Sequence, residues 1–361
     1  MEKRLEKNKK VLLGLSGGVD STAAALLLQN SGYQVTGMFF DVLGNQETER
    51  QKAAHTAKEL GIDFIYRNVS QEFAQTVIGY FCRSYYRGET PNPCVKCNPT
   101  IKFMTMAEEA QRIGAYYLAT GHYAQVAFSE DTHHYFIKKA ESKKKDQSYM
   151  LYALGQDILS RLLLPLGTKQ DKEEVRSFLR KKGLSNAELK DSQEICFIKD
   201  GNYVEFIKDW NLKNPNGNPY AKNSEPGKFV DKNGTVLGIH QGIVNYTIGQ
   251  RKGLGITFGK PVFVTHMNPD ANTVTLGDQE ELFSKDVVST DHLFVEDLSN
   301  YKGKVITAKI RYASIPAEAT IEVGLDGKLI THFKEPQRAA TPGQSIVFYD
   351  GDLLIGGGVI L

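Results

Sequence analysis

Residues 15–22 read LSGGVDST, and they begin at the last residue of the short apolar run KVLLGL at residues 10–15. That run predicts a buried strand, and the following stretch STAAALLLQNSG predicts a helix that ends near Gly32. The octapeptide is therefore expected to form the loop between them. Gly17 and Gly18 let backbone N–H groups turn toward an anion, and the helix start adds the positive end of its dipole. This combination predicts a phosphate site.

The loop differs from the two commonest phosphate motifs, because neither GxxxxGK[ST] nor GxGxxG occurs in it. Ser16 and Ser21 can add hydroxyl groups to the backbone donors. The alternative is a glycine-rich turn in which Asp20 or Ser21 does no more than cap the helix.

Outward from this loop, strands and helices alternate up to about residue 200. Further strands are expected at residues 33–40, 62–69 and 115–123, and helices at residues 47–60, 71–87 and 99–113. Alternation at this spacing predicts an α/β fold, a doubly wound parallel sheet with helices on both faces. In such sheets ligands bind beyond the carboxyl ends of the strands.

After about residue 200 the pattern changes. Gly, Asn and Pro become frequent, and DKNGT at 231–235 and LDGK at 325–328 are hairpin signals. Stretches of period two, such as VITAKIRY, ATIEVGL and QSIVFYD, predict a C-terminal β-barrel or small sandwich. We therefore expect a catalytic domain at 1–199, a small central domain at 200–275 and a C-terminal β-barrel domain at 276–361.

Composition narrows the class of protein without deciding the function. The chain has 361 residues and a net charge of +2, and it lacks a run of eighteen or more apolar residues. Its charged N-terminus does not resemble a signal peptide, so a cytoplasmic, reducing location is expected. There cysteines are more often catalytic or metal-binding than structural disulfides. So small a net charge means that contacts with nucleic acid must depend on local patches.

Two of the four cysteines lie in TPNPCVKCN at residues 90–98. Asn98 and Pro99 look like an N-cap and a first helical residue, which would place Cys97 just before a helix. That position can lower a thiol pKa from about 8.5 to roughly 3.5–7.5. We interpret Cys97 as a nucleophile. Structural zinc and a thioredoxin-like redox pair remain alternatives, although the former needs four ligands and the latter would place Cys94 at the helix start.

The other two cysteines have different settings. Cys82 falls on the same helical face as Ile78, which predicts a core position. Cys196, in KDSQEICFI, is expected on a loop at the start of a strand.

The motif SGGxDS resembles the loop of the ATP pyrophosphatase superfamily, whose members bind ATP, release pyrophosphate and transfer AMP onto a carbonyl or ureido oxygen. The resemblance implies an adenine nucleotide α hydrolase-like fold, with ATP and Mg²⁺ as cofactors. It also implies the nucleotide-binding residues, which are Gly14, Leu15, Ser16, Gly17, Gly18, Val19, Asp20, Ser21, Met38 and Gly121.

An adenylating loop and two cysteines suit one reaction. Oxygen on a pyrimidine C2 is a poor leaving group, and adenylation makes it part of AMP, which leaves easily. Sulfur carried as a persulfide on one cysteine can then attack the activated carbon. The second cysteine attacks the first, which leaves a disulfide.

Seven stretches together resemble the tRNA-specific 2-thiouridylase family. They are GLSGGVDS, TPNPCVKCNPTIKF, ATGHYA, KKDQSYML, SQEICFI, YTIGQRKGLGI and TPGQSIVFYDGD, and they extend from residue 14 to residue 352. The resemblance implies ATP-dependent 2-thiolation of the wobble uridine of tRNA, with Cys97 as nucleophile and Cys196 as the persulfide carrier. A persulfide donor protein, either a cysteine desulfurase or a sulfur relay, is implied as a partner. The implied tRNA contacts are Asn92, Pro93, Cys94, His122, Lys145, Asp146, Gln147, Arg311, Tyr312 and Gln344.

One position departs from the family pattern, since several members carry Asp where this chain has Cys94. A thiol cannot replace a carboxylate in acid–base work, so the role of Cys94 is left open. It could form a disulfide with Cys97, or join Cys97 and Cys196 as three ligands of an iron–sulfur cluster. Two other functions also stay open: an ATP pyrophosphatase that amidates a small molecule, and a non-enzymatic RNA- or zinc-binding module.

Overall fold

The structure is a computed structural model and describes residues 9–189, 195–198, 201–214, 218–257, 259–324 and 326–361. The chain divides into two compact units. Unit 1 comprises Met1–Thr76, Cys94–Gln193 and Asp352–Ile355, and unit 2 comprises Val77–Pro93, Glu194–Gly351 and Gly356–Leu361. Within the described residues, none of the helices has both the length and the apolar character that a membrane span requires.

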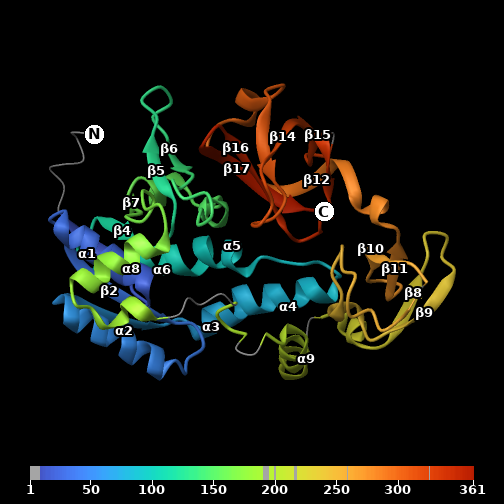
Figure 1. Ribbon diagram of the computed structural model, residues 1–361, viewed down its shortest axis with the longest axis horizontal. Coiled ribbons are helices and arrows are strands. Elements are labelled where there is room, and N and C mark those ends of the chain that lie inside the picture. The colour runs from blue at the N-terminus through green and yellow to red at the C-terminus, as the bar shows by residue number, and fades with distance from the viewer. Residues whose placement is uncertain (1–8, 190–194, 199–200, 215–217, 258, 325) are drawn as a thin grey trace. The chain divides into compact units, whose positions relative to one another are not determined.

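Unit 1 contains a five-stranded sheet in the order β3-β2-β1-β4-β7 (Figure 1). All neighbouring pairs in it are parallel. The strands are β1 (Lys10–Gly14), β2 (Gln34–Asp41), β3 (Asp63–Asn68), β4 (Tyr117–Ala119) and β7 (Leu162–Leu163). The chain proceeds outward from β1 to β3 and then continues with β4 on the other side of β1. The prediction of a doubly wound parallel sheet is confirmed.

Helices cover both faces of this sheet. Val11 and Leu13 of β1 pack in one cluster with Ala24 of α1 and Ala57 of α2. Leu12 points to the opposite face because side chains alternate along a strand, and α6 packs against β1 and β4. The α-helices of unit 1 are α1 (Val19–Asn30), α2 (Glu47–Leu60), α3 (Ser70–Phe73), α6 (Phe103–Arg112), α7 (Gln156–Leu159) and α8 (Lys172–Lys181).

Several helical segments are short, and some are π-helical or 3₁₀-helical. The expected helix at residues 71–87 consists of α3, the π-helical turn η2 (Ala74–Ile78) and α4 (Gly79–Tyr86). A second π-helical turn, η3 (Asn98–Lys102), lies between α5 (Pro93–Cys97) and α6. Short 3₁₀ helices are η4 (Ser148–Leu151), η5 (Ser185–Glu188), η6 (Ala221–Ser224), η7 (Ile243–Asn245), η8 (Gln279–Leu282) and η9 (Leu298–Tyr301).

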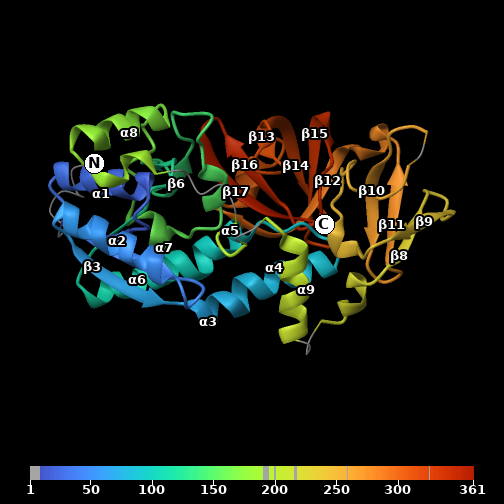
Figure 2. The same cartoon turned by 60° about the horizontal axis from the view of Figure 1, so that its bottom comes forward.

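Unit 2 holds a small four-stranded sheet in the order β10-β11-β8-β9, together with α9 (Tyr203–Lys213) (Figure 2). Its strands are β8 (Gly227–Val230), β9 (Val236–His240), β10 (Phe263–Asn268) and β11 (Thr273–Gly277). The hairpin expected at DKNGT is confirmed, since β8 and β9 are antiparallel and Gly234 in the turn has a φ of +85°.

The C-terminal part of unit 2 is a closed antiparallel barrel of six strands, as the sequence predicts. The order is β12-β15-β14-β13-β16-β17, and pairing of β12 with β17 closes the ring. The strands are β12 (Phe283–Phe294), β13 (Ile306–Lys309), β14 (Ala317–Val323), β15 (Leu329–Arg338), β16 (Ser345–Asp350) and β17 (Leu353–Ile360). Leu353 and Leu354, which belong to unit 1, pair with β6 (Tyr135–Lys138), the partner of β5 (Gln125–Phe128).

Candidate functional site

The loops that follow β1 and β4 meet where the strand order of the unit 1 sheet reverses. A Cβ on Gly121, after β4, would lie 2.9 Å from the carbonyl carbon of Asp20 and 3.0 Å from the nitrogen of Ser21. The glycine therefore permits contact between the β4 loop and the first turn of α1. This edge of the sheet is where doubly wound folds bind their ligands.

The backbone of the first loop requires glycine at one position. Gly17 has a φ of +75°, and a Cβ there would lie 2.9 Å from the nitrogen of Ala53 and 3.0 Å from the carbonyl carbon of Lys52. Both atoms belong to the backbone of α2, which cannot yield without breaking helix geometry. Gly18 is the N-cap of α1 and has an extended backbone. The alternative that Asp20 or Ser21 occupies the N-cap is therefore wrong.

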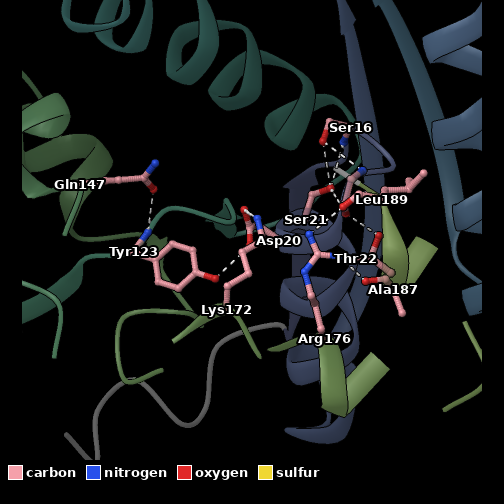
Figure 3. Close-up of polar contacts among 11 residues, drawn as sticks. Ser16, Asp20, Ser21, Thr22, Tyr123, Gln147, Lys172, Arg176, Ala187 and Leu189 are labelled. Carbon is pink, nitrogen blue, oxygen red and sulfur yellow. Dashed lines mark hydrogen bonds and ion pairs between the residues drawn. The ribbon is translucent and has the colours of Figure 1, made fainter. Parts of the chain in front are cut away.

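The two serine hydroxyls of the loop lie together (Figure 3). Ser16 Oγ and Ser21 Oγ are 3.1 Å apart, and the backbone N–H of Ser16 donates to Ser21 Oγ at 3.2 Å. The N–H of Gly18 donates to Ser16 Oγ at 3.3 Å. The loop is thus held in its turn by its own hydroxyl groups, next to the N-terminus of a twelve-residue helix. Hydroxyl and N–H donors at a helix start are the groups that bind phosphate.

Asp20 has a partner on each carboxylate oxygen (Figure 3). Its Oδ2 lies 2.8 Å from the ammonium of Lys172, the first residue of α8, and its Oδ1 accepts a hydrogen bond of 2.9 Å from the hydroxyl of Tyr123. A carboxylate oxygen can accept more than one bond, so Asp20 retains capacity for a cation. No local pattern indicates Lys172, because it lies 152 residues from Asp20 and belongs to no motif.

Asn186 and Arg176 make a further group of contacts near the loop after β1. No sequence pattern indicated these contacts. Asn186 is buried and donates from its side-chain amide to the carbonyl oxygen of Gly17 at 3.2 Å and to the hydroxyl of Thr22. Arg176 of α8 donates to the carbonyl oxygens of Ala187 and, at 2.7 Å, Leu189. Asn186 is thereby tied to the loop after β1, and the residues that follow it up to Leu189 are tied to α8.

The remaining residues expected at the nucleotide lie beneath the loop. Gly14 ends β1 and pairs in register with Met38 of β2, whose carbonyl oxygen accepts the N–H of Leu15 at 2.8 Å. Leu15, Val19 and Met38 are all buried. These three side chains are therefore part of the core next to the loop.

Cys97 lies inside a continuous helical segment, made of α5, η3 and α6. The prediction that Cys97 precedes a helix N-terminus, with Asn98 as the N-cap, is wrong. Asn98 has a different partner, since its side-chain amide donates to the carbonyl oxygen of Met150 at 2.8 Å. A tertiary hydrogen bond has replaced the local capping bond. The π-helical turn that follows Cys97 is a rare conformation that recurs at functional sites.

The thiol of Cys97 is less acidic than the sequence suggested. Burial raises its pKa, and the positive charge and backbone N–H of Lys102 oppose that rise, while the neighbouring Cys94 adds to it. The expected lowering of the pKa by a helix start is therefore wrong. No pattern in the sequence singled out Lys102, which lies five residues after Cys97, at the end of the π-helical turn.

Replacing Lys102 with Gln is expected to slow alkylation of Cys97 by iodoacetamide several-fold near pH 8. The raised pKa means that the thiolate fraction grows as the pH increases, and loss of the ammonium moves this titration to still higher pH. The rate at Cys97 would be followed by peptide mass spectrometry from pH 7 to 10 in a Cys94→Ser background. Lys96→Gln removes the same charge from the exposed side of α5 and is the matched control. Equal rates in both variants would contradict the role of Lys102.

His122 lies in the same unit and shares Lys102 as a neighbour. Its Nδ1 is 2.7 Å from Thr120 Oγ1, and its ring stacks on Phe103 with centroids 6.4 Å apart. Burial, together with the nearby Lys102 ammonium, lowers the pKa of His122 to about 3. His122 is therefore neutral near pH 7, and its ring can stack or form a hydrogen bond but carries no positive charge.

The loop before η4 contains three of the expected tRNA contacts. Asp146 accepts from the N–H of Ala140 at 3.0 Å and from the hydroxyl of Ser148 at 2.9 Å, so its carboxylate shapes the loop. Gln147 is hydrogen-bonded to the backbone of Tyr123. Lys145, next to them, is half-buried.

The other expected tRNA contacts lie in unit 2, apart from the exposed Cys94 in unit 1. The guanidinium of Arg311 donates to the carbonyl oxygens of Arg338, at 2.9 Å, and of Ala339. The amide of Gln344 donates to the carbonyl oxygen of Thr90 at 2.6 Å, and the N–H of Thr90 donates to Pro342 at 2.8 Å. Tyr312 lies beneath the ammonium of Lys309. Asn92 is the last residue of the loop before α5, and Pro93 is the first residue of that helix.

The two remaining cysteines differ in exposure. Cys82 is buried in α4, as predicted, and burial raises the pKa of its thiol to about 12. Cys196 is exposed in a turn, and the next described element is the helix α9, so the expected strand start is wrong. Cys196 belongs to unit 2, whereas Cys97 belongs to unit 1. In the part of the chain that the structure describes, no three His, Cys, Asp or Glu side chains gather as metal ligands. The iron–sulfur cluster stays a prediction.

Three family models match successive parts of the chain. They are described as the tRNA methyl transferase HUP domain, over residues 9–200, the tRNA methyl transferase PRC-barrel domain, over residues 219–278, and the Aminomethyltransferase beta-barrel domain, over residues 285–360. Together they extend over both units.

Similar curated proteins match over nearly their whole length. The tRNA-specific 2-thiouridylase MnmA 1 of Caldanaerobacter subterraneus subsp. tengcongensis is 43% identical over 99% of both chains. The tRNA-specific 2-thiouridylase MnmA of Clostridioides difficile is 44% identical over 98% of both chains. A solved NH3-dependent NAD synthetase from Campylobacter jejuni covers 61% of this chain and 83% of its own at 15% identity, but its TM-score of 0.34 is too low to support an argument.

Proposed function

The chain belongs to the tRNA-specific 2-thiouridylase family, and we propose on that premise that it is an ATP-dependent tRNA sulfurtransferase, which forms 2-thiouridine at the wobble position. One observation carries the proposal: unit 1 combines a preformed glycine loop at a helix N-terminus with a cysteine, Cys97, whose thiol is influenced by the positive charge of Lys102. Two substrates, one with phosphates and one with an electrophilic carbon, suit such a unit. Relatives similar over their whole length carry names that specify tRNA and 2-thiolation.

The phosphates of ATP are proposed to lie on the loop from Leu15 to Ser21, against the N-terminus of α1. Donors are the loop N–H groups and the hydroxyls of Ser16 and Ser21. Asp20 is the carboxylate that would hold Mg²⁺, which when bound neutralises phosphate charge. Lys172, which is 2.8 Å from Asp20, places a second positive charge beside the same phosphates. The chain's own part in this step is to hold the α-phosphate in line with an incoming oxygen.

Adenylation is proposed to activate the uracil. The C2 oxygen attacks the α-phosphorus, the bond from that phosphorus to the bridging oxygen breaks, and pyrophosphate leaves with its electron pair. C2 now carries AMP as a leaving group. Gly121 keeps the loop after β4 close to α1, so the half-buried His122 beside it remains near the nucleotide.

Sulfur transfer is proposed to use both reactive cysteines. The terminal sulfur of a persulfide on Cys196 attacks C2, and AMP leaves with the C2–O electron pair. The thiolate of Cys97 then attacks Sγ of Cys196, a disulfide between the two forms, and the sulfur stays on C2. This step needs their Cα atoms within about 7 Å. An external thiol must then reduce the disulfide, and a persulfide donor protein must reload Cys196.

The tRNA is proposed to contact both units. Lys145 and Arg311 suit phosphate contacts, whereas neutral His122 suits ring contacts. The wobble base must leave its stack to reach Cys97. Asn92, Pro93 and Cys94 precede Cys97 and are proposed to meet the base, although no acid–base role is assigned to Cys94. A cytoplasmic location is part of the same proposal.

The function would be tested by nucleoside mass spectrometry on unmodified tRNA, incubated anaerobically with the protein, Mg-ATP and a persulfide donor. We expect 2-thiouridine that depends on ATP, with Cys82→Ala as a matched control that retains activity. A donor that is active with another thiouridylase but yields no 2-thiouridine here would contradict the proposal. Release of pyrophosphate with ammonia and a small molecule, in the absence of tRNA, would favour the amidating alternative.

A further inference from the structure

Tyr123 lies between two loops of unit 1 that are proposed to bind different substrates (Figure 3). It follows β4 and is 2% exposed. Its hydroxyl donates to Oδ1 of Asp20 at 2.9 Å, in the phosphate loop. Its backbone N–H donates to Oε1 of Gln147 at 3.0 Å, and its carbonyl oxygen accepts the N–H of Gln147 at 2.7 Å. One buried residue therefore contacts both loops through three hydrogen bonds.

On the nucleotide side, Tyr123 helps to fix the direction of a carboxylate. Oδ2 of Asp20 is paired with Lys172 at 2.8 Å, so the tyrosine and the lysine hold its two oxygens from different elements. A hydrogen bond to a carboxylate is about twice as strong as one between neutral groups. If the Tyr123 hydroxyl moves, the orientation of Asp20 toward the bound phosphates must change.

On the RNA side, Tyr123 is tied to the loop from Lys145 to Gln147. The loop is firm, because Asp146 accepts bonds from Ala140 and Ser148. Gln147 is hydrogen-bonded to the main chain of Tyr123 through both its side chain and its main chain. A displacement of this loop would therefore move the backbone of the tyrosine. The ring lies in one buried apolar cluster with Val19 and Ala23 of α1, so the hydroxyl on that ring is the group that links a movement of the tyrosine to Asp20.

We propose that Tyr123 is a positioning residue that couples tRNA binding to nucleotide binding, by linking Gln147 to Asp20. The inference rests on the proposed function, which assigns tRNA to the one loop and ATP to the other. Occupation of either site is expected to favour the same placement of the tyrosine hydroxyl. By linkage, tRNA must then raise nucleotide affinity by the same factor as the nucleotide raises tRNA affinity.

The test is isothermal titration calorimetry of a non-hydrolysable ATP analogue with Mg²⁺, with and without saturating unmodified tRNA. In the unaltered protein we expect tRNA to lower the dissociation constant of the analogue at least about five-fold, a typical coupling. Tyr123→Phe should bring this factor close to one, with both ligands still bound. The fold should survive because the ring remains, and the side chain of Asp20 is 34% exposed, so water can replace the lost donor.

Tyr33→Phe is the matched control, because it removes the same atom from a half-buried tyrosine in another cluster of unit 1. It should leave the coupling unchanged. Gln147→Leu removes the side-chain bond to Tyr123 but keeps the main-chain bond, so it should weaken the coupling, and the double variant should lose no more than Tyr123→Phe alone. Coupling in Tyr123→Phe equal to that in the unaltered protein would overturn the inference, as would its absence from the unaltered protein. Failure to bind either ligand would overturn the proposed function itself.

Discussion

Cys97→Ser is expected to abolish 2-thiouridine formation, with a loss of about 10³-fold or more, as when other nucleophiles are removed. The serine hydroxyl is similar in size, so the helix from α5 to α6 should persist. It cannot form a sulfur–sulfur bond, however, and the C2–S–S–Cys196 intermediate would not be resolved. Nucleoside mass spectrometry measures the product, and pyrophosphate release measures adenylation separately.

Adenylation should survive this substitution, because Cys97 acts only after AMP has been attached. A single turnover of pyrophosphate release without 2-thiouridine would therefore identify the sulfur step as the lost one. Cys82→Ala, which changes a cysteine buried in α4, is the control and should turn over normally. Normal thiolation in Cys97→Ser would remove Cys97 from the mechanism. Cys94→Ser, measured in parallel, reports whether the neighbouring thiol takes part.

Gly17→Ala is expected to weaken ATP binding by about 100-fold or more. Several N–H groups that are proposed to bind phosphate would be displaced together, and each loss of about 1.4 kcal/mol of binding free energy lowers the affinity ten-fold. A Cβ there would lie within 2.9–3.0 Å of two backbone atoms of α2, and the φ of +75° is strained for alanine. The loop must leave its position to relieve both conflicts, and its N–H groups move with it. Calorimetric titration with a non-hydrolysable ATP analogue measures the affinity.

Gly61→Ala separates the effect of backbone strain from the effect of a steric conflict. Gly61 has a φ of +64° at the end of α2, but a Cβ there would meet nothing within 4 Å. This variant should unfold at a lower temperature, with a cost of about 1 kcal/mol for the left-handed backbone, and should bind ATP normally. If Gly17→Ala also kept its ATP affinity, the loop would not be the phosphate site.

Local patterns were sufficient for much of the fold. The helix at 47–60 has the bounds that the sequence predicts, because its C-terminal stop is a glycine in the left-handed conformation, a purely local signal. The doubly wound sheet followed from alternation, and the turn between β1 and α1 followed from two glycines after a buried strand. Cys82 was correctly placed in the core from its spacing to Ile78.

The errors and omissions have a common cause, which is contact between residues far apart in the chain. Asn98 before Pro99 is a good local capping signal, but its amide binds a carbonyl 52 residues away, and the helix continues through Cys97. Lys172 and Asn186 contact Asp20 and Gly17 from 152 and 169 residues away, on elements with no motif of their own. Neither periodicity nor spacing reports such contacts. The pKa of Cys97 could not be predicted for the same reason, since burial determines it.

The closed barrel has a consequence for biosynthesis. β17 is the last of its six strands along the chain, and it supplies the pairing with β12 that completes the ring. Until the ribosome has released β17, β12 and β16 each present an unpaired edge that can join a neighbouring nascent chain. A premature stop codon that removes only this strand would therefore leave the other five strands open and exposed to proteolysis. Chaperones that shield strand edges would act in the interval between synthesis of β12 and emergence of β17.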